Sequence, residues 1–182
     1  MILEPQKLKI CQETVTLRSA EEEDAEELIT YLKTVSAETP FLIREPEEVT
    51  LTLEQERQFI RNAQQSQREL ILLAFVQGEH AGNCSVSALG SYSRYAHRCS
   101  MAIALYRKYQ NRGIGTAMME TALQTAKQMG YEQAELEVAA SNQGALHLYE
   151  KLGFQTYGTF PDNMKYKDGT YEDSCWMMKK IV

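Results

Sequence analysis

A strand-like apolar run, a loop with two glycines and a helical pattern follow one another in the middle of this chain. The run CSMAIALY covers residues 99–106, the loop stretch QNRGIGTAMM covers residues 110–119, and an apolar face then recurs at helical spacing as far as Gly130. Such a unit predicts an α/β fold in which the loop joins a central strand to a helix. Because Gly113 and Gly115 lack side chains, the loop backbone can approach a bound group closely.

The rest of the chain predicts six further strands and three further helices in a mixed sheet. Ser19 is expected to cap an acid-rich first helix, and Thr52 and Gln55 form a capping box that begins the second. Residues 69–76 and 83–91, separated by the turn QGEHAG, predict a hairpin. Strands are expected at 14–18, 69–76, 83–91, 99–106, 133–139, 154–160 and 171–181, and helices at 20–35, 52–65, 113–130 and 142–153.

The chain length and composition fit one domain spanning residues 1–182, with a core from about 14 to 180. The chain is 43% apolar and 24% charged, typical of a soluble globular protein. No run approaches the ~18 apolar residues of a membrane span, and the first residues lack a signal-peptide pattern. We therefore expect a cytoplasmic protein without membrane association.

Charge and cysteine usage restrict the partners. The net charge of −6 argues against general nucleic-acid binding, so an anionic ligand needs a local basic patch such as Arg107, Lys108 and Arg112. The four cysteines are far apart and include no C-x-x-C pair, which predicts reduced thiols and no bound metal.

Three phosphate-binding interpretations of the glycine loop differ in their requirements. A nucleotide P-loop needs Lys followed by Ser or Thr, and a dinucleotide fingerprint needs Gly or Ala where this chain has Met118. The third interpretation is a Q-x-x-G-x-G loop, whose backbone N–H groups from about Arg112 to Thr116 would face one anion at a helix start. A purely structural turn is the alternative.

A second motif, SNQGALHLYEKLGF, covers residues 141–154. Asn142, Ala145, Leu146 and Tyr149 share one helix face, so an amide and a phenol flank an apolar stripe that suits a bound ligand. Alternatively, Tyr149 is an amphipathic core tyrosine. Gly153 is expected to end this helix in a left-handed conformation.

The two motifs in this order resemble the GNAT superfamily, the Gcn5-related N-acetyltransferases. The ending KDGTYEDSCWMMK is also similar to the branch of bacterial ribosomal-protein and small-amine acetyltransferases. The resemblance implies a single α/β domain with a mixed, mostly antiparallel sheet of six or seven strands, flanked by four helices. It also implies a splay between the fourth and fifth strands.

The resemblance further implies that acetyl-CoA is the donor substrate. The loop would hold its pyrophosphate, the strand before the loop would pair with the pantetheine arm, and Asn142 would touch that arm or the acetyl group. Tyr149 would protonate the departing thiolate. The implied cofactor-binding residues are Ile103, Ala104, Leu105, Gln110, Arg112, Gly113, Ile114, Gly115, Thr116 and Asn142.

Direct transfer to an amine needs a base, because a primary amine with a pKa of about 10 is mostly protonated at neutral pH. Glu137 and His97 are the two candidates, with Glu135 on the same strand face as Glu137. Relatives often carry an acid early in the cofactor strand, where this chain has Ser100. A strand N–H near Leu105 would stabilise the oxyanion.

The acceptor site of such enzymes is formed by the loop between the first two helices and the turn before the last strand. These are residues 38–46 and 160–169 here, with Glu38 and Phe41 as substrate-binding candidates and Glu45 and Tyr166 nearby. The expected function is transfer of acetyl to a small-molecule amine or amino acid. A protein or peptide N-terminus is the alternative acceptor, and a non-catalytic acyl-CoA sensor is the alternative class. Homodimers are common in the family that the chain resembles.

Overall fold

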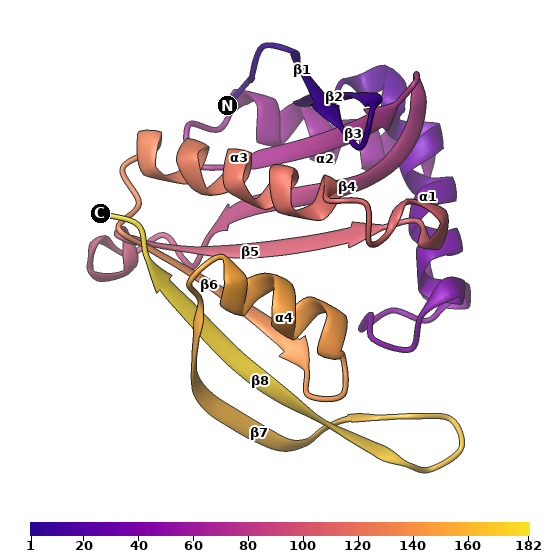
Figure 1. Ribbon diagram of the computed structural model, residues 1–182, viewed down its shortest axis with the longest axis vertical. Helices are drawn as coiled ribbons and strands as arrows, with labels where there is room; N and C mark the ends of the chain where they lie inside the picture. The colour runs from indigo at the N-terminus through magenta and orange to yellow at the C-terminus, as the bar shows by residue number, and fades with distance from the viewer.

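The computed structural model describes residues 1–182 and contains one eight-stranded mixed sheet in the order β1-β2-β3-β4-β5-β6-β8-β7 (Figure 1). The strands are β1 (Gln6–Ile10), β2 (Glu13–Ser19), β3 (Leu70–Val76), β4 (Glu79–Ala88), β5 (Arg98–Leu105), β6 (Gln133–Ala139), β7 (Gln155–Lys165) and β8 (Tyr171–Lys180). The helices are α1 (Ala25–Glu38), α2 (Leu53–Gln65), α3 (Ile114–Gln128) and α4 (Gln143–Lys151).

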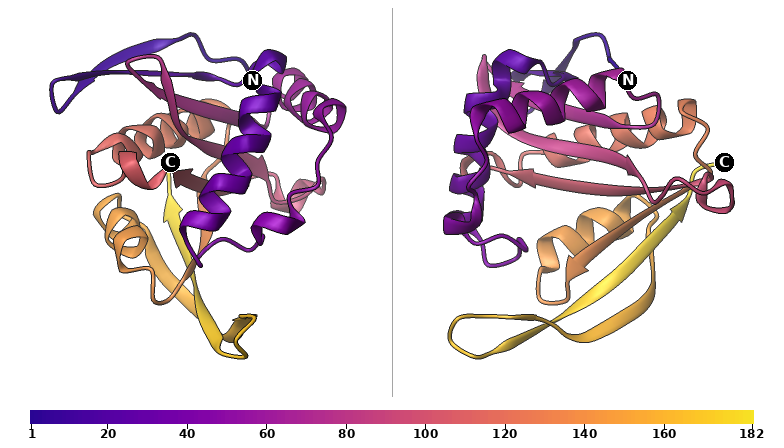
Figure 2. Two further views of the ribbon diagram at one scale, coloured as in Figure 1. Left: turned by 90° about the vertical axis from the view of Figure 1, so that its right-hand side faces the viewer. Right: turned by 180° about the vertical axis from the view of Figure 1, so that it is seen from behind.

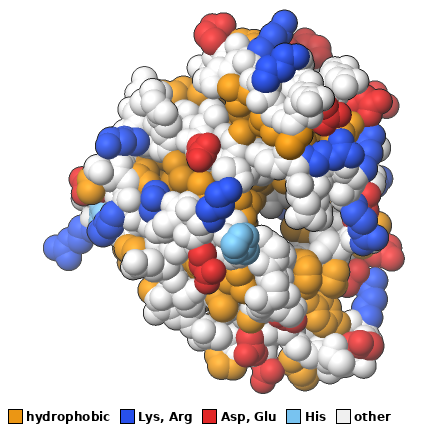
Figure 3. Space-filling view, in the orientation of Figure 1, with side chains coloured by type: hydrophobic (Ala, Val, Ile, Leu, Met, Phe, Trp, Pro, Cys, Tyr) orange, Lys and Arg blue, Asp and Glu red, His pale blue; other side chains and the backbone are white.

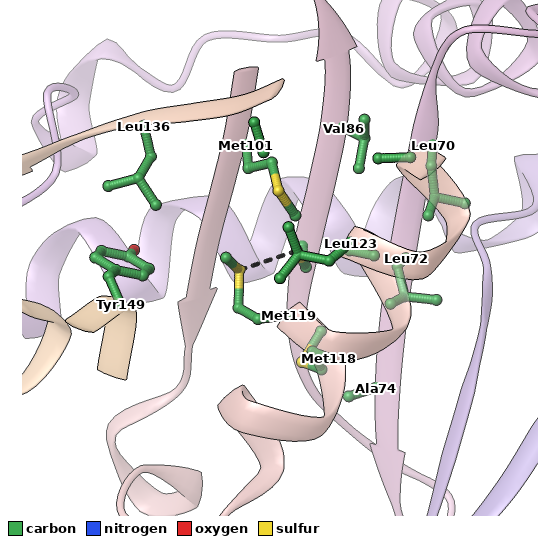
Figure 4. Close-up of a cluster of buried hydrophobic side chains, with 14 of the residues drawn as sticks. Leu70, Leu72, Ala74, Val86, Met101, Met118, Met119, Leu123, Leu136 and Tyr149 are labelled. Atoms are coloured by element: carbon green, nitrogen blue, oxygen red, sulfur yellow. Dashed lines mark hydrogen bonds between the residues drawn. The ribbon is translucent and has the colours of Figure 1, made fainter. Parts of the chain in front are cut away.

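Helices cover both faces of the sheet, with α3 and α4 on one face and α1 and α2 on the other (Figures 1 and 2). This arrangement explains why every residue of β3 is apolar. Leu70 and Leu72 pack with the α3 residues Met118 and Met119 in one core cluster (Figure 4), whereas Ile71 packs with α1 and α2 in the other. The methionines beside the glycine loop are therefore core residues.

The sheet opens in its middle, between β5 and β6. These two strands form the only parallel pair, and their pairing covers just three positions, from Arg98–Gln133 to Ser100–Glu135. Every other neighbouring pair is antiparallel. The predicted mixed, mostly antiparallel α/β fold with four helices and a splay between the fourth and fifth predicted strands is confirmed.

The predicted strand count is one too low, because β1 was missed. Its sequence QKLKI is short and polar, and it pairs with β2 through the turn residues Cys11 and Gln12, which adopt positive φ values of 47° and 68°. Glycine or asparagine is typical of such a turn, so Cys11 and Gln12 carry no turn signal.

Several predicted boundaries also change, among them the end of β7, which extends to Lys165 instead of residue 160. The hairpin turn between β3 and β4 contains only Gln77 and Gly78, so residues 79–82 belong to β4. Ser19 ends β2 and accepts a hydrogen bond from the Leu3 amide instead of capping α1, which follows a 3₁₀ turn at Glu22–Asp24. The Thr52–Gln55 capping box and the left-handed Gly153 are confirmed. None of the helices combines the length and the hydrophobicity needed to cross a membrane.

Candidate active site

The glycine loop presents a run of free backbone donors at the C-terminal end of β5. Gly113 has φ 82° and is the N-cap of α3, whose first internal hydrogen bond runs from Ala117 N to Gly113 O. The amides of residues 111 to 116 donate to no atom of the protein. Consecutive unpaired N–H groups at a helix N-terminus form a binding site for an anion.

Side chains from two other parts of the chain hold this loop. Gln110 Nε2 donates to the Leu105 carbonyl at 3.2 Å, which ties the loop to the end of β5. The turn between β1 and β2 reaches it from the other side, where Cys11 Sγ lies 3.5 Å from the Arg112 carbonyl and Glu13 pairs with the Arg112 guanidinium at 3.4 Å. The β1–β2 turn therefore supports the glycine loop.

The edge of β5 that faces β6 has no strand neighbour beyond Ser100. Ile103, Ala104 and Leu105 lie on this stretch and pair with β4 on their other side. A Cβ atom at Gly115 would lie 3.3 Å from Leu105 Cδ1 and 3.5 Å from Leu148 Cδ2. Gly115 thus lies where α3, β5 and α4 meet, and the structure brings the loop, the open strand edge and α4 together.

The two polar residues predicted on α4 have different surroundings. Asn142 is the N-cap, and its Oδ1 accepts from Ala145 N at 3.2 Å. Tyr149 extends from α4 toward the sheet beside Leu136 (Figure 4) and is only 6% exposed, yet its hydroxyl donates to no other residue. Burial raises the pKa of Tyr149 above its ordinary value, so the phenol keeps its proton at neutral pH.

The base candidates lie at different ends of the opening. Glu137 is exposed, two residues beyond the last β5–β6 pair, and its carboxylate accepts from Asn163 Nδ2 at 2.5 Å. Glu135 instead pairs with Arg98 at 2.5 Å. Burial raises the pKa of Glu135, but hydrogen bonds from Arg98 and Gln133 outweigh this effect and hold the pKa below its ordinary value.

The structure does not bring His97 to the glycine loop. His97 directly precedes the first residue of β5. The glycine loop follows the other end of this strand, whose last residue, Leu105, is eight residues after His97. At a rise of about 3.3 Å per residue, His97 is roughly 25 Å from Leu105.

The two predicted acceptor segments line one cleft with a volume of about 770 Å³. Figure 3 shows the molecule hollowed near the C-terminal end of β5, between α4 and α1. Glu38 lines the cleft, and its carboxylate accepts from the Arg107 backbone N at 2.7 Å. Tyr166 and Glu45 also line it, with Glu45 paired to Lys167 at 3.3 Å. Phe41 belongs to the same segment but is not among the lining residues.

A family comparison matches this arrangement. The model of the acetyltransferase (GNAT) family matches residues 23–154, which include α1, the splay, the glycine loop and α4. The chain belongs to the GNAT family. Among solved GNAT structures, an acetyltransferase from Streptococcus pneumoniae is 32% identical, with a TM-score of 0.87 over 91% of this chain and 99% of that one. A phosphinothricin acetyltransferase from Sinorhizobium meliloti, solved in complex with acetyl-CoA, has a TM-score of 0.80 at 17% identity, over 91% of this chain and 88% of that one.

Relatives identified by sequence differ in the acceptors that their names give. N-alpha-acetyltransferase MAK3 of Arabidopsis thaliana is 31% identical over 86 residues, which are 47% of this chain and 45% of that protein. The L-amino acid N-acetyltransferase AaaT of Escherichia coli is 26% identical over 111 residues, 59% of this chain and 66% of that protein. The matched segment thus spans less than half the length of the plant protein.

Two residues of this GNAT site were not predicted from the sequence. Asn163 lines the cleft and contacts Glu137, and Tyr31 of α1 contacts the backbone of β5 at Ala104. Asn163 lies in a segment that was expected to form the acceptor site, so its position was the available signal. Tyr31 occurs in an ordinary apolar stripe, and nothing in the sequence distinguishes it from a core residue.

Proposed function

We propose that this GNAT protein transfers the acetyl group of acetyl-CoA directly to a primary amine, with a small-molecule amine or amino acid as the favoured acceptor. The observation that carries the proposal is the run of unpaired amides at residues 111–116, placed at the mouth of the β5–β6 opening. These donors fit a pyrophosphate, and the free edge of Ile103 to Leu105 fits the amide-containing pantetheine arm.

Acetyl-CoA supplies an acyl carbon bound to a thiolate leaving group. The neutral amine forms an N–C bond to that carbon, the C–S bond breaks, and the amine loses one proton while the thiolate gains one. The Leu105 N–H is the donor that we assign to the carbonyl oxygen. The Tyr149 hydroxyl, which is protonated and free of protein partners, is the group that we assign to the thiolate.

Glu137 is the base that the arrangement supports best. Its carboxylate lies just beyond the point where β5 and β6 separate and contacts Asn163, a residue of the cleft wall. A carboxylate there can take a proton from an ammonium group in the cleft, directly or through one water. His97 is too far from the loop for this role.

Replacing Glu137 by Gln is expected to lower kcat/KM for the amine about ten- to hundredfold, because the amide cannot accept the proton. Steady-state rates with acetyl-CoA and the amine provide the measurement. Glu135→Gln is the matched control, because it removes a carboxylate from the same strand that is paired with Arg98. A kcat/KM in Glu137→Gln equal to that of the wild type would exclude Glu137 as the base.

The acceptor preference rests on the size of the cleft. A volume of about 770 Å³ is in the range of small-molecule sites. The charges of its wall are balanced, because three acidic residues are accompanied by three basic ones: Glu38, Glu45, Glu47, Arg44, Arg107 and Lys165. A protein or peptide N-terminus is the second candidate, which the name of the Arabidopsis relative favours.

Two experiments test the function. Calorimetric titration with acetyl-CoA should show binding, and a panel of amines and amino acids should then show release of the CoA thiol. Mass spectrometry of proteins acetylated with and without the chain separates small amines from protein N-termini. Binding without turnover on any acceptor would instead identify an acyl-CoA sensor.

A further inference from the structure

The hydroxyl of Tyr31 is inserted between two strands of the sheet. Tyr31 lies on α1 and is only 1% exposed, with its ring against those of His80 and Tyr106 at centroid distances of 4.9 and 5.2 Å. Its hydroxyl donates to the Ala104 carbonyl of β5 at 2.7 Å and accepts from the Asn83 amide of β4 at 3.4 Å.

The hydroxyl reaches one residue pair of the β4–β5 ladder. Asn83 and Ala104 are direct partners across this antiparallel pair. Two residues beyond Ala104, the Tyr106 backbone N donates to the Ala81 carbonyl at 3.0 Å. The strands approach each other closely at Gly82, where a Cβ atom would lie 2.4 Å from Ala104 O. The Tyr31 hydroxyl thus adds a side-chain hydrogen bond to the ladder near the end of β5.

This contact fixes the direction of one peptide group. The chain has no cis peptide bonds, so the C=O of Ala104 and the N–H of Leu105, which share a peptide plane, point in opposite directions. The Tyr31 hydroxyl donates to this carbonyl and also accepts from the Asn83 backbone N of β4, so it holds the carbonyl on the β4 side. The Leu105 N–H consequently points to the other side of β5, where the sheet is open.

We propose that Tyr31 is a positioning residue, which aims the Leu105 N–H into the opening where it meets the carbonyl oxygen of the acetyl group. The inference rests on the proposed acetyl transfer and adds a residue from the opposite face of the sheet to it. Tyr31 itself touches neither the donor nor the acceptor. It acts through the Ala104–Leu105 peptide, whose orientation determines how well the developing oxyanion is stabilised.

The variant Tyr31→Phe tests this role, because it removes the hydroxyl and retains the ring. We expect kcat to fall about ten- to hundredfold, while KM for acetyl-CoA changes less than about threefold, because the loss affects the reacting carbonyl and not the pyrophosphate loop. Tyr131→Phe is the matched control. Tyr131 is also buried and donates to one backbone carbonyl, that of Arg68 at 2.8 Å, away from the loop.

A merely structural role for Tyr31 predicts that both variants lose stability and that their kcat values remain alike, which would overturn the proposal. Amide hydrogen exchange of the full chain gives a second readout. Acetyl-CoA should slow exchange at Leu105 at least about tenfold in the wild type and in Tyr131→Phe, but not in Tyr31→Phe. If the wild type acetylates no amine, the proposed function fails, but the exchange experiment remains a separate test of Tyr31. Equal slowing of Leu105 exchange by acetyl-CoA in the wild type, Tyr31→Phe and Tyr131→Phe would refute the role of Tyr31.

Discussion

Gly115→Glu is expected to raise the dissociation constant for acetyl-CoA at least about 100-fold, which corresponds to about 2.7 kcal/mol. Residue 115 lies in the first turn of α3, among the unpaired amides, so a carboxylate there would repel the pyrophosphate. Its Cβ would also press on Leu105 and Leu148 at 3.3 and 3.5 Å. Calorimetric titration with acetyl-CoA measures the effect.

Two control variants separate charge from bulk. Gln124→Glu adds the same charge to an exposed position two turns along α3 and should leave the affinity within about twofold. Gly115→Ala adds only the methyl group, which Leu105 can accommodate by a small shift, so the affinity should fall much less than in Gly115→Glu. Binding of acetyl-CoA by Gly115→Glu with wild-type affinity would contradict the assignment of the loop.

Tyr149→Phe is expected to lower kcat about 100- to 1,000-fold while the acetyl-CoA dissociation constant stays within about twofold, because only the transfer of a proton to the thiolate is lost. The hydroxyl has no protein partner in the structure, so its removal leaves no polar group unpaired. The melting temperature should accordingly change by less than about 3 °C.

Measuring both kcat and the melting temperature separates a loss of catalysis from a loss of stability. A fall in kcat with an unchanged melting temperature excludes a loss of stability as its cause, whereas Tyr131→Phe should lower the melting temperature and leave kcat unchanged. Single-turnover measurements then show whether the lost rate lies in the transfer step. Wild-type kinetics for Tyr149→Phe would remove this residue from the mechanism.

Most of the fold was predictable because its elements carry strong periodic patterns. The β3 run and the apolar face of α3 have one interpretation each, and the Thr52–Gln55 box gave the start of α2 correctly. β1 was missed because its pairing depends on β2 and on a turn without glycine or asparagine. Tertiary contacts, rather than local preference, make that segment a strand.

The candidate site also contains some parts that local sequence patterns identify and others that only tertiary contacts identify. The glycine loop and the α4 motif are each contiguous in sequence, so both could be located from spacing, while their roles were implied by the resemblance to the GNAT family. Tyr31 and Asn163 contact segments that are 73 and 26 residues away, and no local pattern reports such contacts. His97 is close in sequence to the cofactor strand but lies at its wrong end, a distinction that only the direction of β5 provides.

The narrow connection between β5 and β6 has a consequence for the motions of the whole molecule. Within the sheet, three residue pairs and the Arg98–Glu135 ion pair join the strands β1–β5 to β6, β8 and β7, while one core cluster packs against both parts. Because few backbone hydrogen bonds cross this boundary, we expect the amides beside it to exchange faster than those of the central strands. An acetyl-CoA molecule bound along β5 would connect the two sides of this boundary. We therefore expect the complex with acetyl-CoA to be more rigid than the free protein.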